Sequence, residues 1–315
     1  MTEADEMIWL ERRDPRLDRL VAADARPETV ADGFRWAEGP VWDRGRNCLY
    51  FSDVKANRVY RWTATAGAEE FLVPSGWQGP EPFAGPEPGA NGLTIDAEGR
   101  LVLCEHGDRR IRRREPDGTM TVLVDRYQGR RLNSPNDLVF RSDGWLYFTD
   151  PCYGLPETTA DPGRELPFAG VFRVSPAGEV ELLIDELGAP NGIAFSPDER
   201  TLYLSNSDHA CPAWLAYDLD ADGRLGEGRL LRDAREYRRQ RPGSPDGLKL
   251  DRDGYLFATG PGGVYVFAPD GAHLGTILTH SRTGNVAWGE DGSTLFICAD
   301  SRLLRMRVLT RGAGW

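Results

Sequence analysis

One short strand pattern occurs six times along the 315-residue chain. Each copy is a run of mostly apolar residues with leucine in second position, as in Cys48-Leu-Tyr-Phe-Ser-Asp53 and Trp145-Leu-Tyr-Phe-Thr-Asp150. The repeated leucines, which are spaced 39–56 residues apart, are Leu49, Leu101, Leu146, Leu202, Leu256 and Leu295. Because one such unit cannot bury its apolar face alone, the six units must pack against one another.

The period and the short strands together predict the fold class. A repeat of about 40–50 residues with glycine-rich turns between strands is typical of a propeller blade. We therefore predict an all-β, six-bladed β-propeller that forms a single domain over residues 1–315. A helix is expected only within the N-terminal extension 1–25, over Asp14–Ala22. Residues 28–34 are expected to add an outer strand to the last blade and so close the ring.

A second repeat lies a few residues before each of these strands. It places one acid or amide at the start of the innermost strand, and the six residues are Glu38, Asn91, Asn136, Asn191, Asp246 and Asn285. Innermost strands of a propeller line the central channel, so we expect these side chains to form a ring at one depth. Oxygen donors of this kind suit hard cations such as Ca²⁺, which predicts a metal site in the channel. The alternative is that these residues only form Asx turns.

Several motifs resemble those of the gluconolactonase family, which includes regucalcin, also called senescence marker protein, and the drug-responsive lactonases. The matching stretches cover nearly the whole chain and are Trp36-Ala-Glu-Gly-Pro-Val-Trp42, Ala90-Asn-Gly-Leu-Thr94, Cys104-Glu-His-Gly107, Arg131-Leu-Asn-Ser-Pro-Asn-Asp137, Tyr147-Phe-Thr-Asp-Pro151, Tyr153-Gly154, Pro190-Asn-Gly192 and Ser244-Pro-Asp-Gly247. The resemblance implies a six-bladed propeller with one catalytic divalent cation, with Ca²⁺ favoured and Zn²⁺, Mg²⁺ or Mn²⁺ as alternatives.

The resemblance also implies roles for individual residues. It assigns the metal ligands to Glu38, Asn136, Asn191 and Asp246, and it makes Asp246 the general base or nucleophile. The expected substrate contacts are Asn91, His106, Asn136, Tyr153 and Asn285, although His106 could equally be a structural histidine. The implied reaction is hydrolysis of a sugar-acid lactone, such as a gluconolactone, to the aldonic acid.

A proline- and glycine-rich loop, residues 76–89, is longer than the family norm. Because it directly precedes Asn91, we expect it to reach the channel mouth. Trp77 and Phe83 could then cover a sugar ring, while Glu81 and Glu87 would disfavour substrates that carry a free carboxylate. The alternative is a surface insertion without a role in binding.

Other functions remain as alternatives at this point. A related metal-dependent esterase, lactonase or organophosphate hydrolase would share the ring, and a calcium-binding propeller without catalysis would also need it. The Asp218-x-Asp220-x-Asp222-Gly223 motif resembles an EF-hand loop, but its twelfth position is Arg229, which indicates a hairpin turn. Cys152 replaces a proline usual in the family and is expected to be a buried filler rather than a reactive thiol.

Charge and cysteine content limit which partners and which cellular compartment we expect for the protein. The net charge of −11 disfavours nucleic acid and anionic membranes as partners. The partner that the resemblance implies is a small-molecule lactone. The five cysteines are widely spaced and include no C-x-x-C pair, so no disulfide framework or zinc site is predicted. Residues 1–7 lack the basic and apolar regions of a signal peptide, and we expect a cytoplasmic protein. Nothing in the sequence indicates the oligomeric state.

Overall fold

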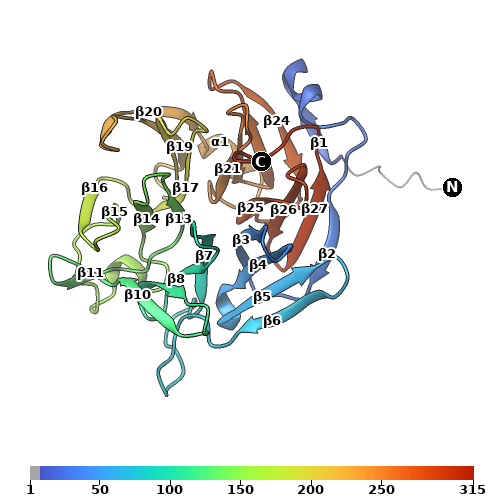
Figure 1. Ribbon diagram of the computed structural model, residues 1–315. Helices are drawn as coiled ribbons and strands as arrows, with labels where there is room; N and C mark the ends of the chain where they lie inside the picture. The colour runs from blue at the N-terminus through green and yellow to red at the C-terminus, as the bar shows by residue number, and fades with distance from the viewer. Residues whose placement is uncertain (1–7) are drawn as a thin grey trace.

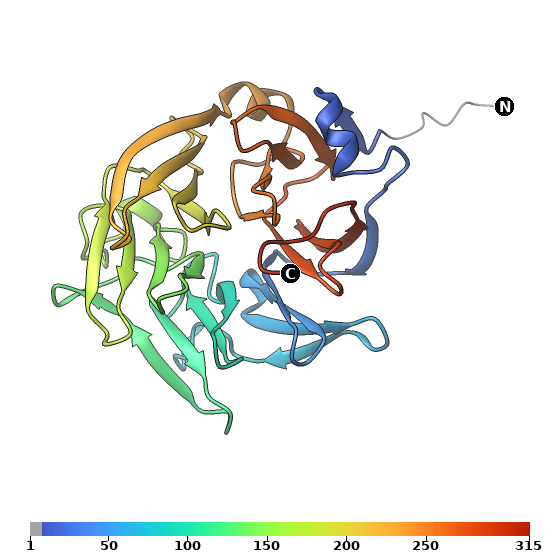
Figure 2. The same cartoon turned by 45° about the horizontal axis from the view of Figure 1, so that its top comes forward.

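The computed structural model describes residues 8–315, so the acidic segment 1–7 lies outside the described residues. Six antiparallel sheets of four or more strands stand around a common axis, and the chain runs from one sheet to the next around the ring (Figure 1, Figure 2). The prediction of an all-β, six-bladed propeller is confirmed. No helix within residues 8–315 is long and apolar enough to span a membrane.

Each blade is described here from its innermost strand outward. Blades 1 to 3 are β3 (Ala37–Asp43), β4 (Cys48–Asp53), β5 (Arg58–Thr63) and β6 (Gly67–Leu72); β7 (Ala90–Ile95), β8 (Leu101–Glu105), β9 (Arg110–Arg114) and β10 (Met120–Val124); and β13 (Leu138–Phe140), β14 (Leu146–Asp150), β15 (Gly170–Val174) and β16 (Val180–Ile184). Blades 4 to 6 are β17 (Pro190–Phe195), β18 (Thr201–Asn206), β19 (Ala213–Leu219) and β20 (Leu225–Asp233); β21 (Leu248–Leu250), β22 (Leu256–Gly260), β23 (Gly263–Phe267) and β24 (His273–Leu278); and β25 (Asn285–Gly289), β26 (Thr294–Ala299) and β27 (Arg302–Arg307). A separate hairpin is formed by β11 (Arg126–Tyr127) and β12 (Arg130–Arg131).

The N-terminal part of the chain adds strands to the last two blades. Strand β2 (Glu28–Asp32) pairs with β27 as the outer strand of blade 6, and it lies beside the C-terminal blade in Figure 1. Strand β1 (Leu10–Arg12), which the sequence pattern did not predict, adds a fifth strand to blade 5 by pairing with β24. The first and last parts of the chain therefore share sheets, and the ring is closed by main-chain hydrogen bonds.

Helical structure is confined to short segments. The predicted helix over Asp14–Ala22 is a 3₁₀ turn, η1 (Pro15–Arg19), capped by the Asp14 side chain, which accepts a hydrogen bond of 2.9 Å from the Arg16 N–H. Two further 3₁₀ turns are η2 (Val54–Ala56) and η3 (Thr158–Ala160), and the α-helix α1 (Arg235–Gln240) was not predicted.

The core lies between the blades. All six repeated leucines are 6% exposed or less, and the cores between neighbouring blades contain aromatic residues from the same strands, such as Phe51 and Phe148. Full burial of a leucine side chain stabilises a fold by about 1.5–3 kcal/mol. The repeated leucines therefore mark the apolar surface that each blade buries against its neighbours.

Hydroxyl groups near the end of the repeated strand join one blade to the next. Ser52 donates a 2.8 Å hydrogen bond to the carbonyl of Asn91, and Thr149 donates a 2.7 Å bond to the carbonyl of Asn191. Ser205 likewise donates to the carbonyl of Asp246 at 2.5 Å. In each case the acceptor is a ring residue of the following blade. The two repeats are therefore linked, because the strand repeat fixes where the next ring residue lies.

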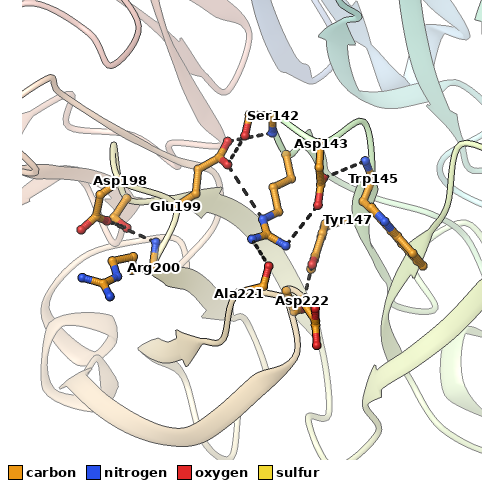
Figure 3. A network of polar contacts seen from close by, with 12 residues as sticks. Ser142, Asp143, Trp145, Tyr147, Asp198, Glu199, Arg200, Ala221 and Asp222 are labelled. Atoms are coloured by element: carbon orange, nitrogen blue, oxygen red, sulfur yellow. Dashed lines mark hydrogen bonds and ion pairs between the residues drawn. The ribbon is translucent and has the colours of Figure 1, made fainter.

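Blades 3 and 4 are also joined through the turns between β13 and β14, between β17 and β18, and between β19 and β20 (Figure 3). Arg141 donates to the carbonyl of Ala221 at 2.9 Å, and the Tyr147 hydroxyl donates to the carbonyl of Gly223 at 2.8 Å. Glu199 accepts hydrogen bonds from both the N–H and the hydroxyl of Ser142. The acidic segment 218–223 thus covers the end of β19 and the turn to β20, which docks on blade 3. Among residues 8–315 its aspartates form no group that could hold a metal ion.

Candidate active site

Each of the six ring residues lies at or just before the first residues of an innermost strand. These strands are the labelled segments nearest the centre of Figure 1, and each contacts the inner strands of its two neighbours. In three blades the pairing register shifts just after the ring residue, between Glu38 and Val41, between Ala90 and Leu93, and between Pro190 and Ile193. A bulge of this kind bends the strand and redirects side chains. The ring side chains thereby turn toward the axis.

The glycines beside the ring residues allow the inner strands to approach closely. Gly39 adopts a φ of 53°, and a Cβ at this position would overlap the main chain of Asn91. A Cβ at Gly247 would overlap the amide group of Asn285. Both positions require glycine because the neighbouring ring residue occupies the space.

One large cavity opens at this end of the ring. Its volume is about 940 Å³, and it is lined by five ring residues together with Tyr153; the ring residues are Glu38, Asn91, Asn136, Asn191 and Asp246. Glu38, Asn136 and Asn191 are at most 4% exposed, so only a small part of each side chain faces the cavity. The structure brings together all four residues that the resemblance assigns as metal ligands.

Two predicted contacts do not line this cavity. Asn285 is 2% exposed, and its amide nitrogen approaches Asp137 at 3.3 Å. His106 is fully buried behind Asn136, with its Nε2 atom 3.1 Å from Asn136 Oδ1. A side chain without accessible surface cannot touch a ligand in the cavity, so His106 is not placed for the direct substrate contact that we expected.

The carboxylates of the ring are electrostatically strained. Burial raises the pKa of Glu38, and the negative charges of Asp137 and Glu87 raise it further. Burial also raises the pKa of Asp246 well above its ordinary value, and the charge of Glu38 adds to this effect. A cation between two such groups would stabilise both as anions.

Asp137 was missed by the sequence analysis although it lies inside a quoted motif. It follows Asn136 at a position where four other ring residues have glycine. Its carboxylate is 2% exposed, accepts a 2.9 Å hydrogen bond from the Leu138 N–H, and lies 3.9 Å from the Lys249 ammonium group. The sequence therefore contained a clue to Asp137, because an acid in place of a turn glycine adds a negative charge next to the ring.

The amides of the ring form a chain of hydrogen bonds. Asn136 donates to Asn191 Oδ1 at 2.6 Å, Asn191 donates to the Ser207 hydroxyl at 3.0 Å, and Ser207 donates to the carbonyl of Pro245 at 2.5 Å. Ser207, which the sequence analysis did not select, also lines the cavity. Burial raises the pKa of Tyr153, so its phenol stays protonated beside Ser207 and Asn191.

Of the four residues of the loop 76–89 that were expected near the channel mouth, only Glu87 lines the cavity. Trp77 and Phe83 pack against each other, with ring centroids 5.4 Å apart, and neither lines the cavity. Glu87 does line it, with its Oε2 atom 3.1 Å from His106 Nδ1. The prediction that the aromatic pair covers the substrate is wrong, because the two rings pack against each other and lie outside the cavity lining.

Basic side chains lie around the mouth of the cavity. Lys55, Arg238, Arg241 and Arg282 all line it, and Arg241 is paired with Glu11 of strand β1. Sequence patterning did not select them because they come from separate loops and from α1. Cys152 lines the same cavity, and burial raises the pKa of its thiol to about 11, which fits a filler rather than a nucleophile.

The donor set determines which metal the cavity could hold. Within residues 8–315, no three or more His, Cys, Asp or Glu side chains are grouped so that they alone could bind a metal ion. A cation here would need amide oxygens as well as the carboxylates of Glu38 and Asp246. Each amide oxygen has two lone pairs, so Asn136 and Asn191 keep one for a ligand beyond their present partners. Such a site fits a hard cation better than zinc.

Comparisons with known proteins agree with this architecture. Residues 36–301 match the family model described as the SMP-30/gluconolactonase/LRE-like region. A gluconolactonase of Zymomonas mobilis is 44% identical over 95% of this chain and 85% of its own length, and a 6-deoxy-6-sulfogluconolactonase of Pseudomonas putida is 30% identical over 82% and 81%. The solved structure of a gluconolactonase from Xanthomonas campestris matches with a TM-score of 0.83 and 33% identity, covering 96% of this chain and 95% of that one. The resemblance drawn from the motifs is therefore confirmed, and the chain belongs to the SMP-30/gluconolactonase/LRE-like family.

Proposed function

We propose that this protein is a cation-dependent lactonase that hydrolyses a sugar-acid lactone, such as a gluconolactone, to the aldonic acid. The observation that carries the proposal is the convergence of Glu38 and Asp246 with Asn136 and Asn191 at one cavity. These residues come from four different blades, and they lie in the motifs on which the resemblance to the family rests. Substrate class is supported by the 44% identity to the Zymomonas mobilis gluconolactonase.

The four residues would hold one divalent cation, with Ca²⁺ favoured, and the cation would supply Lewis-acid polarisation of the lactone carbonyl. Asp246 takes a proton from the attacking water as that water bonds to the carbonyl carbon. The bond from this carbon to the ring oxygen then breaks, and the ring oxygen takes up a proton. The products are a hydroxyl group and a carboxylic acid that ionises at neutral pH.

Other cavity residues bind and orient the sugar. Asn91 offers an amide at the cavity wall, and the protonated phenol of Tyr153 can donate to a sugar hydroxyl. Asn285 supports the ring from behind through Asp137 rather than by direct contact. A cytoplasmic location is supported by the five unpaired cysteines in residues 8–315, since thiols persist in a reducing compartment.

The test is proton release from a panel of aldonolactones in weakly buffered solution, with and without Ca²⁺. We expect cation-dependent acceleration over spontaneous ring opening, and Asp246→Asn should lower kcat by about 100-fold or more, since a general base typically contributes that much. Asp208→Asn is the matched control, because Asp208 lines the mouth of the same cavity outside the ring. No acceleration for any lactone would end the proposal. Ca²⁺ binding without turnover would instead indicate a binding propeller.

A further inference from the structure

We propose that Glu87 and His106 are positioning residues that fix the orientation of the Asn136 amide at the active site. His106 has no accessible surface and lies between the other two side chains. Its Nε2 atom is 3.1 Å from Asn136 Oδ1, and its Nδ1 atom is 3.1 Å from Glu87 Oε2. The inference deepens the proposed function, because Asn136 is one of the residues assigned to the cation.

The direction of the hydrogen-bond chain can be derived from its far end. The carbonyl of Pro245 can only accept, so the Ser207 hydroxyl must donate to it at 2.5 Å. Ser207 then accepts from the Asn191 amide nitrogen, which leaves Asn191 Oδ1 to face Asn136. Asn136 therefore donates through Nδ2 and presents Oδ1 to His106.

This direction of the hydrogen bonds determines which nitrogen of His106 must carry a proton. A proton on its Nε2 atom is required, because Asn136 Oδ1 is an acceptor. If the imidazole rotated away, Asn136 Oδ1 would lose this donor, the Asn136 amide could turn, and nitrogen could replace oxygen at the cavity wall. A hard cation binds amide oxygen and not amide nitrogen, so the orientation decides whether the site can be occupied.

Glu87 holds the other side of the ring. Among residues 8–315, His106 Nδ1 is buried and makes no well-aligned hydrogen bond, so the Glu87 carboxylate at 3.1 Å is the group available to it. The imidazole thus lies between two oxygen atoms, with Asn136 Oδ1 3.1 Å from Nε2 and Glu87 Oε2 3.1 Å from Nδ1. Carboxylates behind a histidine commonly fix its orientation at metal sites, and removing such partners typically lowers affinity or activity by about 10–100-fold.

The surrounding backbone restricts the position of the histidine. The His106 N–H donates to the carbonyl of Gly89 at 3.1 Å, which ties the histidine to the end of the loop that carries Glu87. Gly154 packs so closely against the His106 Cα and Cβ atoms that a Cβ there would overlap them. Loop 76–89 therefore acts on the active site through Glu87 and His106, and not by covering the substrate.

The experiment measures Ca²⁺ affinity by calorimetry, kcat and KM for a gluconolactone, and the melting temperature in four variants. Glu87→Ala and Glu87→Gln should weaken Ca²⁺ binding and lower kcat by about 10–100-fold, with a smaller change in KM because Asn91 and Tyr153 remain. His106→Gln, whose amide can still donate to Asn136, should retain more activity than His106→Ala. Glu81→Gln is the control on the same loop, since the Glu81 side chain is exposed and forms no hydrogen bond or ion pair within residues 8–315, while its main-chain carbonyl accepts from Trp77.

Unchanged Ca²⁺ affinity and kcat in both Glu87 variants would overturn the inference, even if their melting temperatures fell. The Glu87 variants keep this test decisive if the buried histidine variants fail to fold. If the wild-type protein turned over no lactone, the proposed function would fail on its own. The Ca²⁺ affinities would then still decide whether Glu87 and His106 orient the site.

Discussion

At the scale of single residues, the behaviour of the site is dominated by Glu38 and Asp246. Burial raises the pKa of both carboxylates; the charge of Glu38 raises that of Asp246 further, and the charges of Asp137 and Glu87 raise that of Glu38. In the absence of a cation, ionising them works against folding. This strain follows first from the burial of the two carboxylates and then from the negative charges around them.

The strain predicts a pH dependence for the cation-free protein. Burial and neighbouring charges raise the pKa of Glu38 to about 8, against an ordinary value of 4.5. A raised pKa in the folded state favours folding while the group is protonated, so stability is fully present below the ordinary value and declines as pH rises toward about 8. Thermal melts in chelator from about pH 5 to pH 9 should show this decline, and Glu38→Gln should flatten it. A melting temperature independent of pH in both proteins would contradict the prediction.

Single residues also show which parts of the site the sequence could predict and which it could not. The repeat selected Glu38, Asn91 and Asn191 because the same offset from an inner strand recurs in each blade. It missed Glu87 because this residue lies in the non-repeating loop 76–89, and only the fold brings it to His106. His106 itself follows a strand that leads to the channel face, but sequence position could not show that Asn136 lies between it and the cavity.

At the scale of elements, the repeated strand has two roles: it packs the core between blades, and it positions the ring residue of the next blade. Its leucine fills the core between blades, while a hydroxyl near its end fixes the next ring residue. Thr149 shows this most clearly, since its buried hydroxyl donates to the carbonyl of Asn191 and accepts from the Asp137 N–H at 3.2 Å. The strand therefore determines the position of two residues at the site.

This arrangement predicts the effect of Thr149→Val, which keeps the shape and removes the hydroxyl. The carbonyl of Asn191 and the N–H of Asp137 would lose a buried partner, and leaving such groups unsatisfied costs about 1–3 kcal/mol each. We expect a lower free energy of unfolding in urea and weaker Ca²⁺ binding. Thr29→Val, at an exposed position of β2, should change stability by less than about 0.5 kcal/mol. Equal effects of the two substitutions would refute the role assigned to Thr149.

The loop 76–89 can be divided into a tip and a base. The Trp77 N–H donates to the carbonyl of Pro88 at 2.7 Å, so the base is closed without the tip. Replacing Gly79–Pro86 with two glycines keeps Glu87, and we expect kcat and Ca²⁺ affinity close to those of the intact protein. The same shortened loop with Glu87→Ala should lose about 10–100-fold in both. Identical kinetics in the two shortened proteins would show that Glu87 is not the contributing residue.

Short elements were less predictable than the repeat. Strand β1 has only Leu10–Arg12 and carries no alternating pattern, so its pairing with β24 depends on the tertiary structure. Helix α1 (Arg235–Gln240) is largely polar and lacks the apolar period of a predicted helix. Both elements nonetheless bear on the cavity, since Glu11 pairs with Arg241 at its mouth and Arg238 projects from α1.

At the scale of the whole molecule, a cation on the axis would connect several blades at once. A ligand that binds only the folded ring stabilises it by mass action, by about 2.7 kcal/mol at a concentration one hundred times its dissociation constant. Exhaustive chelation should therefore lower the melting temperature, and Ca²⁺ should restore it in proportion to the logarithm of its concentration. Elemental analysis of protein purified without added metal identifies the ion. An unshifted melting curve would argue against an occupied axial site.

The distribution of charge over the molecule predicts how the product leaves. The protein has a net charge of −11, yet Lys55, Arg238 and Arg282 line the cavity and form no ion pair within residues 8–315. Arg238 instead donates to the main-chain carbonyls of Gly243 and His209. The lactone is neutral and the aldonate is an anion, so these cations attract the product more than the substrate.

We therefore expect the aldonate to inhibit competitively, and more weakly as salt is raised from about 10 to 300 mM, since salt screens charges at an open mouth. The double substitution Arg238→Gln with Arg282→Gln should weaken product inhibition several-fold while leaving KM for the neutral lactone nearly unchanged. Arg239→Gln, on the same helix but outside the cavity lining, is the matched control. Inhibition constants that ignore both salt and the double substitution would show that the mouth does not sense the product charge, and release would then depend on the ring residues alone.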